Sequence, residues 1–467
     1  MLGGHKISGV WATIREAVRG TDIDYTTAPV GRAVILLSVP MVVEMAMESI
    51  FAVADVFWVA RLGADAVATV GLTESMMTII YTAAMGLSIG ATALVSRRIG
   101  EQDPEGAAHA AGQSILLGLA MAAAIALLAA PNAAALLRLM GATDTVLQSG
   151  TGFTRIMLGG NATVLLLFLL NAVFRGAGDA AIAMRVLVFG NVLNIVLGPC
   201  FIFGLGPFPA LGVAGAATAT NIGRGSAVLY QLYTLTRGRG RVRVGLRHLR
   251  FDVKAMATVV RLSGLGTVQI LISTASYIGL VRILSGFGSA ALAGYTIGIR
   301  LIIFALLPAF GLSNAAATMV GQNLGAGRPD RAEQAVWTAA IYNMVFLGAV
   351  GLVFLAFAPF ITSLFTTDPL VQPYAIGCLR IVSLGFVFYA YGMVLTSAFN
   401  GAGDTWTPTW INLFVFWLFE IPLAWFLAAR GGFGARGVFI ALTVAYSMLA
   451  VVSAILFRRG SWKLKGV

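Results

Sequence analysis

The sequence predicts an all-α, polytopic membrane protein with twelve transmembrane helices in two six-helix lobes. Of its 467 residues, 58% are hydrophobic and 11% are charged, with a mean hydropathy of +0.89. Soluble domains average about 45–50% apolar and about 25% charged residues. The apolar residues also form long runs, and the two halves of the chain repeat one another. These observations exclude a soluble multidomain enzyme and a disordered chain.

The apolar runs define the spans, because a transmembrane helix needs about 20 predominantly apolar residues. The predicted spans are 33–60, 66–97, 107–130, 149–174, 181–204, 211–236, 256–285, 290–321, 332–357, 372–399, 406–430 and 436–459. The predicted domains are an N-terminal segment (1–30), an N-lobe (31–236), a basic linker (237–255), a C-lobe (256–459) and a tail (460–467).

The distribution of lysine and arginine predicts the orientation in the membrane. With the N-terminus inside, 21 of the 31 basic residues lie on the cytoplasmic side, seven of them between Arg237 and Lys254. Both termini are therefore expected to be cytoplasmic, in a multi-pass protein of the inner (plasma) membrane. This asymmetry explains the net charge of +12 without a nucleic acid partner. The basic linker is interpreted as an anchor on anionic lipid.

The two halves are related by a constant offset of 225 residues. The clearest pair is Phe174-Arg-Gly-Ala-Gly-Asp179 and Phe399-Asn-Gly-Ala-Gly-Asp404, and Gly86-Leu-Ser88 likewise returns as Gly311-Leu-Ser313. Six spans in each half give the two copies the same topology, related by an axis along the membrane normal. Such repeats place a substrate site between the lobes, near the midplane, and operate by alternating access.

The order of these motifs resembles that of the multidrug and toxic compound extrusion (MATE) transporters. The matching elements are Pro40, Asp55-Val-Phe-Trp58 with Gly63, Gly86-Leu-Ser-Ile-Gly90, Arg97-Arg98-Ile-Gly100, Gly176-Ala-Gly-Asp179, Gly212-Val-Ala-Gly-Ala216, Gly321-Gln-Asn-Leu-Gly325 and Gly401-Ala-Gly-Asp404. The resemblance covers about residues 30–460. It implies a V-shaped pair of lobes that exports cationic or amphiphilic compounds in exchange for H⁺ or Na⁺.

Acidic residues inside spans are the main functional candidates, because a charge at the bilayer centre costs about 2.5–3.5 kcal/mol. Glu44, Glu48 and Asp55 share one face of the first predicted helix, within about 40° at 100° per residue. Glu74 and Glu420 are the other two acids inside spans. The repeat copies of the first three are Gln269, Ser273 and Leu280, so this acidic face belongs to the N-lobe alone.

The acidic face has two interpretations. Carboxylates away from water can hold a proton and release it when a cation arrives, which makes Asp55, Glu44 and Glu48 candidates for cation coupling. Asp55 also occupies the position of the family's first-helix aspartate. Alternatively, Glu44 and Glu48 pair with a buried arginine or bond neighbouring helices.

The fifth span departs from the family pattern. Members commonly carry an aspartate just before the proline of this span, where this sequence has Gly198. We hypothesise that Glu44 or Glu48 replaces the missing charge. Asn194 is expected to bond to Asp55 as part of the coupling site, and a helix-packing amide is the alternative for Asn194 and for Asn171.

The seventh and tenth spans carry no acid in the stretches where the NorM-like branch places them, Gln269-Ile-Leu-Ile-Ser-Thr274 and Tyr389-Ala-Tyr-Gly392. This favours the DinF-like branch and H⁺ over Na⁺. Arg300 and Glu420 lie at similar depth, which predicts a structural ion pair; a second cation contact at Glu420 is the alternative. Arg282 is expected either to pair with Asp55 in an outer gate or to reach the outer headgroups.

The candidates for the lining of a substrate cavity are Asn171, Asn191, Gln269, Tyr277, Tyr389 and Glu420. The protein is expected to act as a monomer on small amphiphilic or cationic molecules, without a cofactor apart from the coupling ion. A flippase of lipid-linked precursors is the alternative function, although it would need a basic cavity. An enzyme is not predicted, since no phosphate-binding loop or paired aspartate motif occurs. Three separated histidines (His5, His109 and His248) predict no metal site.

Overall fold

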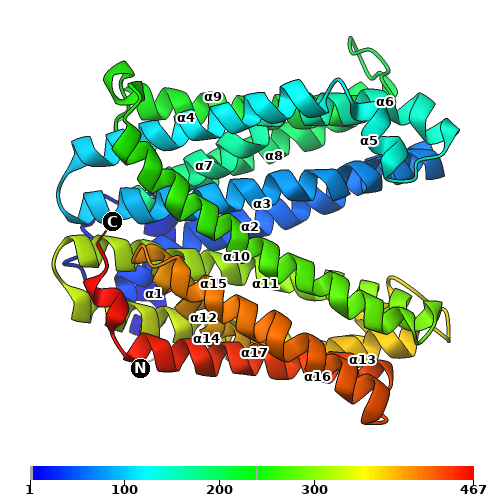
Figure 1. The fold of residues 1–467 in the computed structure, drawn as a ribbon. Helices are drawn as coiled ribbons and strands as arrows, with labels where there is room; N and C mark the ends of the chain where they lie inside the picture. The colour runs from blue at the N-terminus through cyan, green and yellow to red at the C-terminus, as the bar shows by residue number, and fades with distance from the viewer. Residues whose placement is uncertain (1–3, 238–239, 467) are drawn as a thin grey trace. The chain divides into compact units, whose positions relative to one another are not determined.

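The structure is a computed structural model that describes residues 4–237 and 240–466. Within these ranges all regular structure is helical (Figure 1). The long helices of the first half are α2 (Val30–Val59), α3 (Ala64–Gly100), α4 (Pro104–Ala129), α6 (Asp144–Gly159), α7 (Ala162–Ala177), α8 (Ala180–Phe203) and α9 (Val213–Arg237). Those of the second half are α10 (Val253–Ser285), α11 (Ser289–Gly325), α12 (Pro329–Ser363), α13 (Gln372–Ser383), α14 (Phe386–Gly401) and α17 (Ala435–Arg458).

Among the described residues, the remaining elements are a segmented helical run in the second half and five further helices. One continuous helical run consists of α15 (Trp406–Asn412), the π-helical segment η3 (Leu413–Glu420), α16 (Ile421–Trp425) and a second π-helical segment, η4 (Phe426–Arg430). The others are α1 (Gly4–Arg19), α5 (Ala133–Leu139), η1 (Ala60–Leu62), η2 (Leu246–Leu249) and η5 (Ser461–Leu464).

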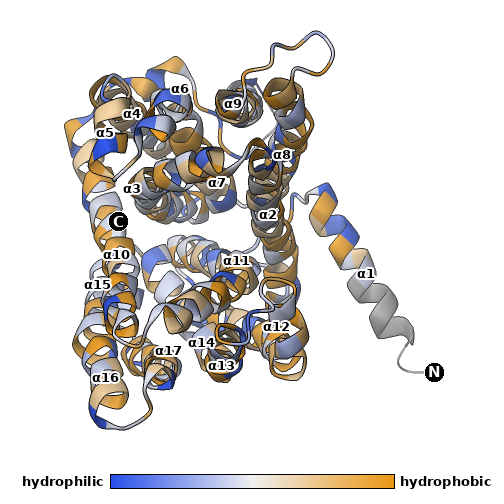
Figure 2. Ribbon diagram, turned by 90° about the vertical axis from the view of Figure 1, so that its right-hand side faces the viewer, coloured by the Kyte–Doolittle hydropathy of each residue, from blue (hydrophilic) through white to orange (hydrophobic). Residues whose placement is uncertain are grey.

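The predicted polytopic all-α class is confirmed. Among the described residues, ten helical runs are long and apolar enough to cross a membrane, and the pair α13 and α14, bent by 58°, makes an eleventh. The predicted span 211–236 corresponds to α9, which is long enough but not apolar enough because Asn221, Arg224 and Gln231 interrupt it. Hydrophobic residues dominate the helices elsewhere (Figure 2).

The chain divides into two compact units, which are treated separately below. Unit 2 consists of Arg15–Asp22 and Val43–Thr267. Unit 1 consists of the described residues of Met1–Ile14, Ile23–Val42 and Val268–Val467. Besides the divisions near the N-terminus, one inside α1 and one after Asp22, the divisions fall inside α2 and α10. Each of these two long helices therefore begins in one unit and ends in the other.

Glycine allows α8 and α9 to pack closely in unit 2. A Cβ added to Gly190 would lie 3.0 Å from the carbonyl oxygen of Gly223, and one added to Gly223 would lie 2.7 Å from that of Gly190. Small residues of this kind let membrane helices approach at backbone distance. The contact fixes the position of α9, and with it that of Arg224, the residue that follows Gly223.

The repeated Gly-Ala-Gly-Asp motif has the same structural role in each unit. In unit 2, the Asp179 carboxylate accepts a hydrogen bond from the backbone N–H of Arg241 at 2.9 Å, and the Arg241 side chain lies 3.7 Å away. In unit 1, Asp404 lies 3.6 Å from the ammonium group of Lys465. Each aspartate thus binds the segment that follows the last helix of its own half. Burial raises the pKa of Asp179, and the N–H of Arg241 opposes that shift.

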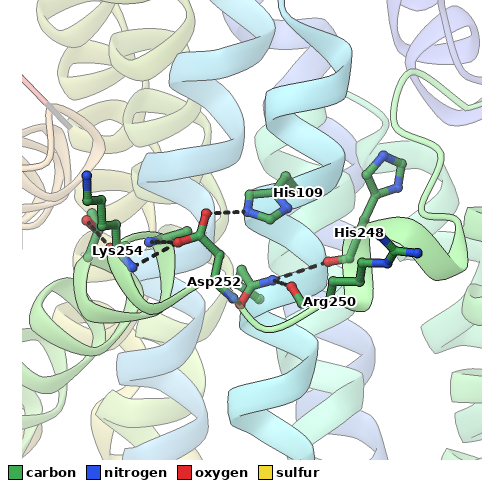
Figure 3. A network of polar contacts seen from close by, with 8 residues as sticks. His109, His248, Arg250, Asp252 and Lys254 are labelled. Atoms are coloured by element: carbon green, nitrogen blue, oxygen red, sulfur yellow. Dashed lines mark hydrogen bonds and ion pairs between the residues drawn. The ribbon is translucent and has the colours of Figure 1, made fainter.

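The basic linker lies along α4, where three of its backbone groups bond to one side chain (Figure 3). The buried amide of Gln113 donates to the carbonyls of His248 (3.3 Å) and Arg250 (2.7 Å), and its oxygen accepts the N–H of Asp252 at 3.2 Å. His109 and Asp252 are also paired at 3.3 Å. The linker is therefore part of the folded structure of unit 2.

We expect Gln113→Leu to destabilise the protein by about 1–3 kcal/mol, because the linker's backbone groups would lose their partners. Thermal unfolding of the purified protein in detergent measures the loss. Gln148, which is exposed on α6, supplies the matched control Gln148→Leu. Equal stability of the two variants would show that the linker does not depend on Gln113.

The ionisation of Asp252 should make the folding stability of the protein depend on pH. The backbone N–H groups of Ala255 and Lys254, and then His109, lower the pKa of this carboxyl. A lowered folded-state pKa stabilises the fold above the unfolded-state value, about 3.9, and the stabilisation is lost as the pH falls through the folded-state pKa. The difference in thermal stability between the wild type and Asp252→Asn should therefore be present at pH 7, begin to decrease near pH 4, and disappear once the pH is below the folded-state pKa. A difference that persists unchanged in acid would contradict this prediction.

Candidate functional site

Helix α2 brings the three acidic residues of the first predicted span into unit 2. The helix continues without a break from Pro40 to Val59, so Glu44, Glu48 and Asp55 follow one another on a single helical face. Glu44 is fully buried, whereas Glu48 and Asp55 are partly exposed. The predicted acidic face is present in the structure.

Glu44 is paired with an arginine of α7. Its Oε1 lies 2.5 Å from Nη1 of Arg175, and both side chains are buried. Oε2 of Glu44 has no hydrogen-bond partner among the described residues. Breaking a buried pair of this kind is strongly destabilising, since the remaining charge is left without a partner. The pairing agrees with the structural alternative for Glu44 given above, and a role of Glu44 in cation coupling stays a prediction.

Glu48 is paired with an arginine of α9. Arg224 is 2% exposed and donates from Nη2 to Glu48 Oε1 at 3.0 Å and from Nη1 to the Tyr81 hydroxyl at 3.0 Å. Its guanidinium group also lies over the rings of Phe51 (4.9 Å) and Tyr81 (5.7 Å). A weakly hydrated, planar cation suits such a site of aromatic faces and acceptors. Arg224 is thus fixed by contacts with α2 and α3.

Asp55 differs from the other two acids because it has no hydrogen bond or ion pair in the part of the chain that the structure describes. The charged groups that act on it are Glu74, on α3, and Arg224. Glu74 interacts in turn with Arg224 and Glu48. Four carboxylates therefore surround two guanidinium groups, which leaves two negative charges uncompensated when all four acids are ionised. Asp55 and Glu74 are the two acids of this group that have no hydrogen bond or ion pair of the side chain in the part of the chain that the structure describes.

The expected hydrogen bond between Asn194 and Asp55 is not present. The Asn194 amide donates to the hydroxyl of Thr220 on α9 at 2.9 Å. Spacing along α8 could not show this, because the partner comes from a different helix. The role of Asn194 in coupling stays a prediction.

The other two asparagines of the first half also bond within the helix packing. Asn191 donates to the carbonyl of Met47 at 3.2 Å, and Asn171 accepts from Gln231 at 2.5 Å. Both are buried. These contacts support the helix-packing interpretation of Asn171, and the proposed cavity lining by Asn171 and Asn191 stays untested.

Gly198, where the family aspartate is missing, has room for a side chain. A Cβ there would lie 3.8 Å from the Trp58 ring, an ordinary contact. Sterics therefore do not explain the glycine. Glu44 and Glu48 each pair with an arginine. The hypothesis that one of them replaces the missing charge stays a prediction.

The predicted ion pair between Glu420 and Arg300 in unit 1 is wrong. Glu420 is fully buried, and neither of its oxygens has a hydrogen-bond partner among the described residues. Arg300 is exposed on α11. Equal depth along two helices does not fix the direction of their side chains, and here the guanidinium group lies on the surface of its helix.

The remaining candidates of unit 1 are found on α10 and α14. Gln269 is buried, and its carbonyl accepts from Asn412 at 3.4 Å. Tyr277 and Tyr389 are partly exposed. Arg282 is exposed near the end of α10, and its predicted pairing with Asp55 stays a prediction.

Two arginines of the site were not recognised from the sequence. Neither Arg175 nor Arg224 was given a role from the sequence. The signal for Arg224 was its place near the middle of the predicted span 211–236, because an ionisable residue within a membrane is a functional candidate by default. The repeat copies are Asn400 and Leu449, so these arginines, like the acids, occur in the first half alone.

The chain matches a family model over both halves. The MatE model covers residues 40–200 and 267–426, more than half of the chain. The chain belongs to the MatE family of transporters. The resemblance inferred from the motifs is confirmed at the level of the family, and the assignment to the DinF-like branch stays a prediction.

Relatives and solved structures agree with this MatE assignment. The chain is 25% identical to a probable multidrug resistance protein NorM of Thermotoga maritima (93% of this chain, 94% of the relative) and 26% identical to an FAD transporter of Shewanella oneidensis (93% and 95%). It resembles an outward-facing multidrug resistance MATE transporter of the MOP superfamily with a TM-score of 0.87 and 27% identity, covering 97% of this chain and 98% of that one. None of these relatives is named a flippase of lipid precursors.

Proposed function

We propose that this MatE protein exports cationic or amphiphilic small molecules in exchange for protons, and that Asp55 is the residue that exchanges the proton. The observation that carries the proposal is the contrast along α2. Glu44 and Glu48 each have an arginine partner, whereas Asp55 has none among the described residues. An acid that is not neutralised by a partner can bind a proton or a cation in turn, as an antiporter requires.

The charge balance of the site supports a positively charged substrate. Two negative charges remain uncompensated around Asp55 and Glu74 when all four acids are ionised. The nearby faces of Tyr81 and Phe51 already stabilise the guanidinium of Arg224, which shows that this environment tolerates a planar cation. The relative named an FAD transporter makes an anionic substrate the second candidate class.

Protons are favoured over sodium as the coupling ion on chemical grounds. Hard cations need several oxygen ligands around them. Among the described residues no group of three or more Asp, Glu, His or Cys side chains is placed to hold a metal ion, and the guanidinium of Arg224 acts on Asp55. A proton needs a single carboxylate oxygen, and the neutral acid that it forms is not repelled by the arginine.

The spans and the distribution of basic residues support a proposal for the membrane location and orientation of the transporter. We propose a monomer in the inner membrane with both termini in the cytoplasm, since most basic residues outside the spans then lie inside. No cofactor is proposed besides the coupling ion. Lysine and arginine that are not bound within the linker, such as Lys254, remain available to anionic lipid.

Inverted membrane vesicles that contain the full-length protein test the proposal. An imposed gradient with an acidic lumen should drive accumulation of a cationic dye, and a sodium gradient at equal pH should not. An anionic flavin as substrate tests the second candidate class. Dye accumulation that follows sodium and ignores pH would overturn the assignment of the coupling ion, and accumulation of the flavin alone would overturn that of the substrate.

A further inference from the structure

Glu420 is a buried acid that the proposed coupling site does not use. It ends η3 within unit 1, has 0% exposure, and neither carboxylate oxygen has a hydrogen-bond partner among the described residues. Native structures satisfy most buried polar atoms, so two orphaned oxygens on one side chain need an explanation. An isolated carboxylate in an apolar environment is not stable unless a proton or a cation compensates its charge.

No basic side chain supplies that compensation. No ion pair of Glu420 is found in the described part of the chain, and the arginines of the helices around it are exposed: Arg282, Arg300, Arg430, Arg436 and Arg458. The groups that interact with Glu420 are tyrosines instead: Tyr277 of α10, Tyr295 of α11, Tyr389 of α14 and Tyr446 of α17.

The tyrosines form a polar shell that is itself incompletely bonded. Tyr389 stacks on Tyr446 with ring centroids 3.8 Å apart, and Tyr446 is buried. The hydroxyl of Tyr295 has no hydrogen-bond partner among the described residues. Tyr277 and Tyr389 are partly exposed and thus connect this shell with its surroundings. A hydroxyl can donate to a carboxylate and accept from a carboxylic acid, so the shell suits both states of Glu420.

The backbone before Glu420 is π-helical, and the nearby Pro422 explains this irregularity. Pro422 has no N–H for the carbonyl of Leu418, and membrane helices accommodate such a gap by local π-helical adjustment. Segment η3 ends at Glu420, two residues before Pro422. Contacts with α10 then fix the segment, because Trp417 donates to the carbonyl of Ile272 at 2.8 Å and Asn412 to the hydroxyl of Ser273 at 3.0 Å. π-Helical insertions occur frequently at functional sites.

We propose that Glu420 is a second proton-binding site, which lies in unit 1 and is separate from the Asp55 site of unit 2. A proton from water binds one carboxylate oxygen to form an O–H group, and the same bond breaks when the proton returns to water. The tyrosine hydroxyls are groups that can accept from the neutral acid or donate to the carboxylate. This proposal rests on the proposed proton-coupled function for its physiological use, whereas the protonation itself is tested independently.

Infrared difference spectroscopy of the full-length protein in liposomes, between alkaline and acidic pH, tests the site. The acidic state should show a carbonyl band of protonated carboxyl groups, and Glu420→Gln should remove one component of this band. The control Glu101→Gln, on an exposed residue at the end of α3, should leave that component unchanged. A band that is unchanged in Glu420→Gln would overturn the proposal, as would a Glu420 component that persists at every pH.

Two further measurements keep the test decisive. If Glu420→Gln does not fold, Tyr446→Phe should shift the frequency of the Glu420 component, because one hydroxyl of its shell is lost; an unshifted band would contradict the proposal. Proton release on binding of the cation tetraphenylphosphonium should be smaller in Glu420→Gln than in the wild type. Absence of any release from the wild type would count against the proposed function, while the infrared result still decides the site.

Discussion

Asp55→Asn should reduce proton-driven export to the level of liposomes without protein. The amide keeps the shape of the side chain but cannot take up or release a proton. Because Asp55 has no ion pair to lose, the thermal stability of the variant should change by no more than about 1 kcal/mol. Efflux of a cationic dye from proteoliposomes, measured together with thermal unfolding of the same preparation, checks both expectations.

Asp65→Asn is the matched control for this experiment. Asp65 is an exposed aspartate in the first turn of α3 and lies outside the group of interacting acids. The control should export at the rate of the wild type. Wild-type export by Asp55→Asn would remove Asp55 from the mechanism, and a large loss of stability would show that Asp55 has a structural contact instead.

Arg224→Leu should destabilise the protein by about 3–5 kcal/mol, the usual cost of removing one partner of a buried ion pair. The substitution leaves Glu48 without its partner and removes the positive charge that acts on Glu74 and Asp55. It also removes the cation that lies over Phe51 and Tyr81. Thermal unfolding in detergent, with the protein concentration held constant, measures the effect.

The double variant Arg224→Leu with Glu48→Gln separates charge from packing. If the destabilisation comes from the charge left on Glu48, the second substitution should restore part of the lost stability. A loss that is the simple sum of the two single losses would mean that the pair has no coupling energy, and that Arg224 acts through its contacts with the aromatic rings alone.

The helical architecture and the acidic face could be predicted from the sequence because each depends on local periodicity and composition. Long apolar runs specify membrane helices, and the spacing of Glu44, Glu48 and Asp55 is a property of one helix. The repeat also shows which charges occur in one half only, since the copies of Glu44, Glu48, Asp55, Arg175 and Arg224 are uncharged.

The partners of the polar side chains could not be predicted in the same way. Asn194 bonds to Thr220 on the following helix, and Glu44 bonds to Arg175 on a helix 131 residues away. Hydropathy gives the depth of a residue but not the direction in which it points around the helix, which is why Glu420 and Arg300 were wrongly paired. Arg224 was visible as a charge inside a span, yet its role became clear only with the geometry of α9.

The central claim is that substrate and protons move in opposite directions through this MatE protein. Proteoliposomes loaded with tetraphenylphosphonium and an internal pH indicator, diluted into buffer without substrate or sodium, test it directly. Exit of the substrate should acidify the interior in the wild type, and the acidification should be absent in Asp55→Asn. Exit of the substrate at the same rate without any change of internal pH would contradict the claim.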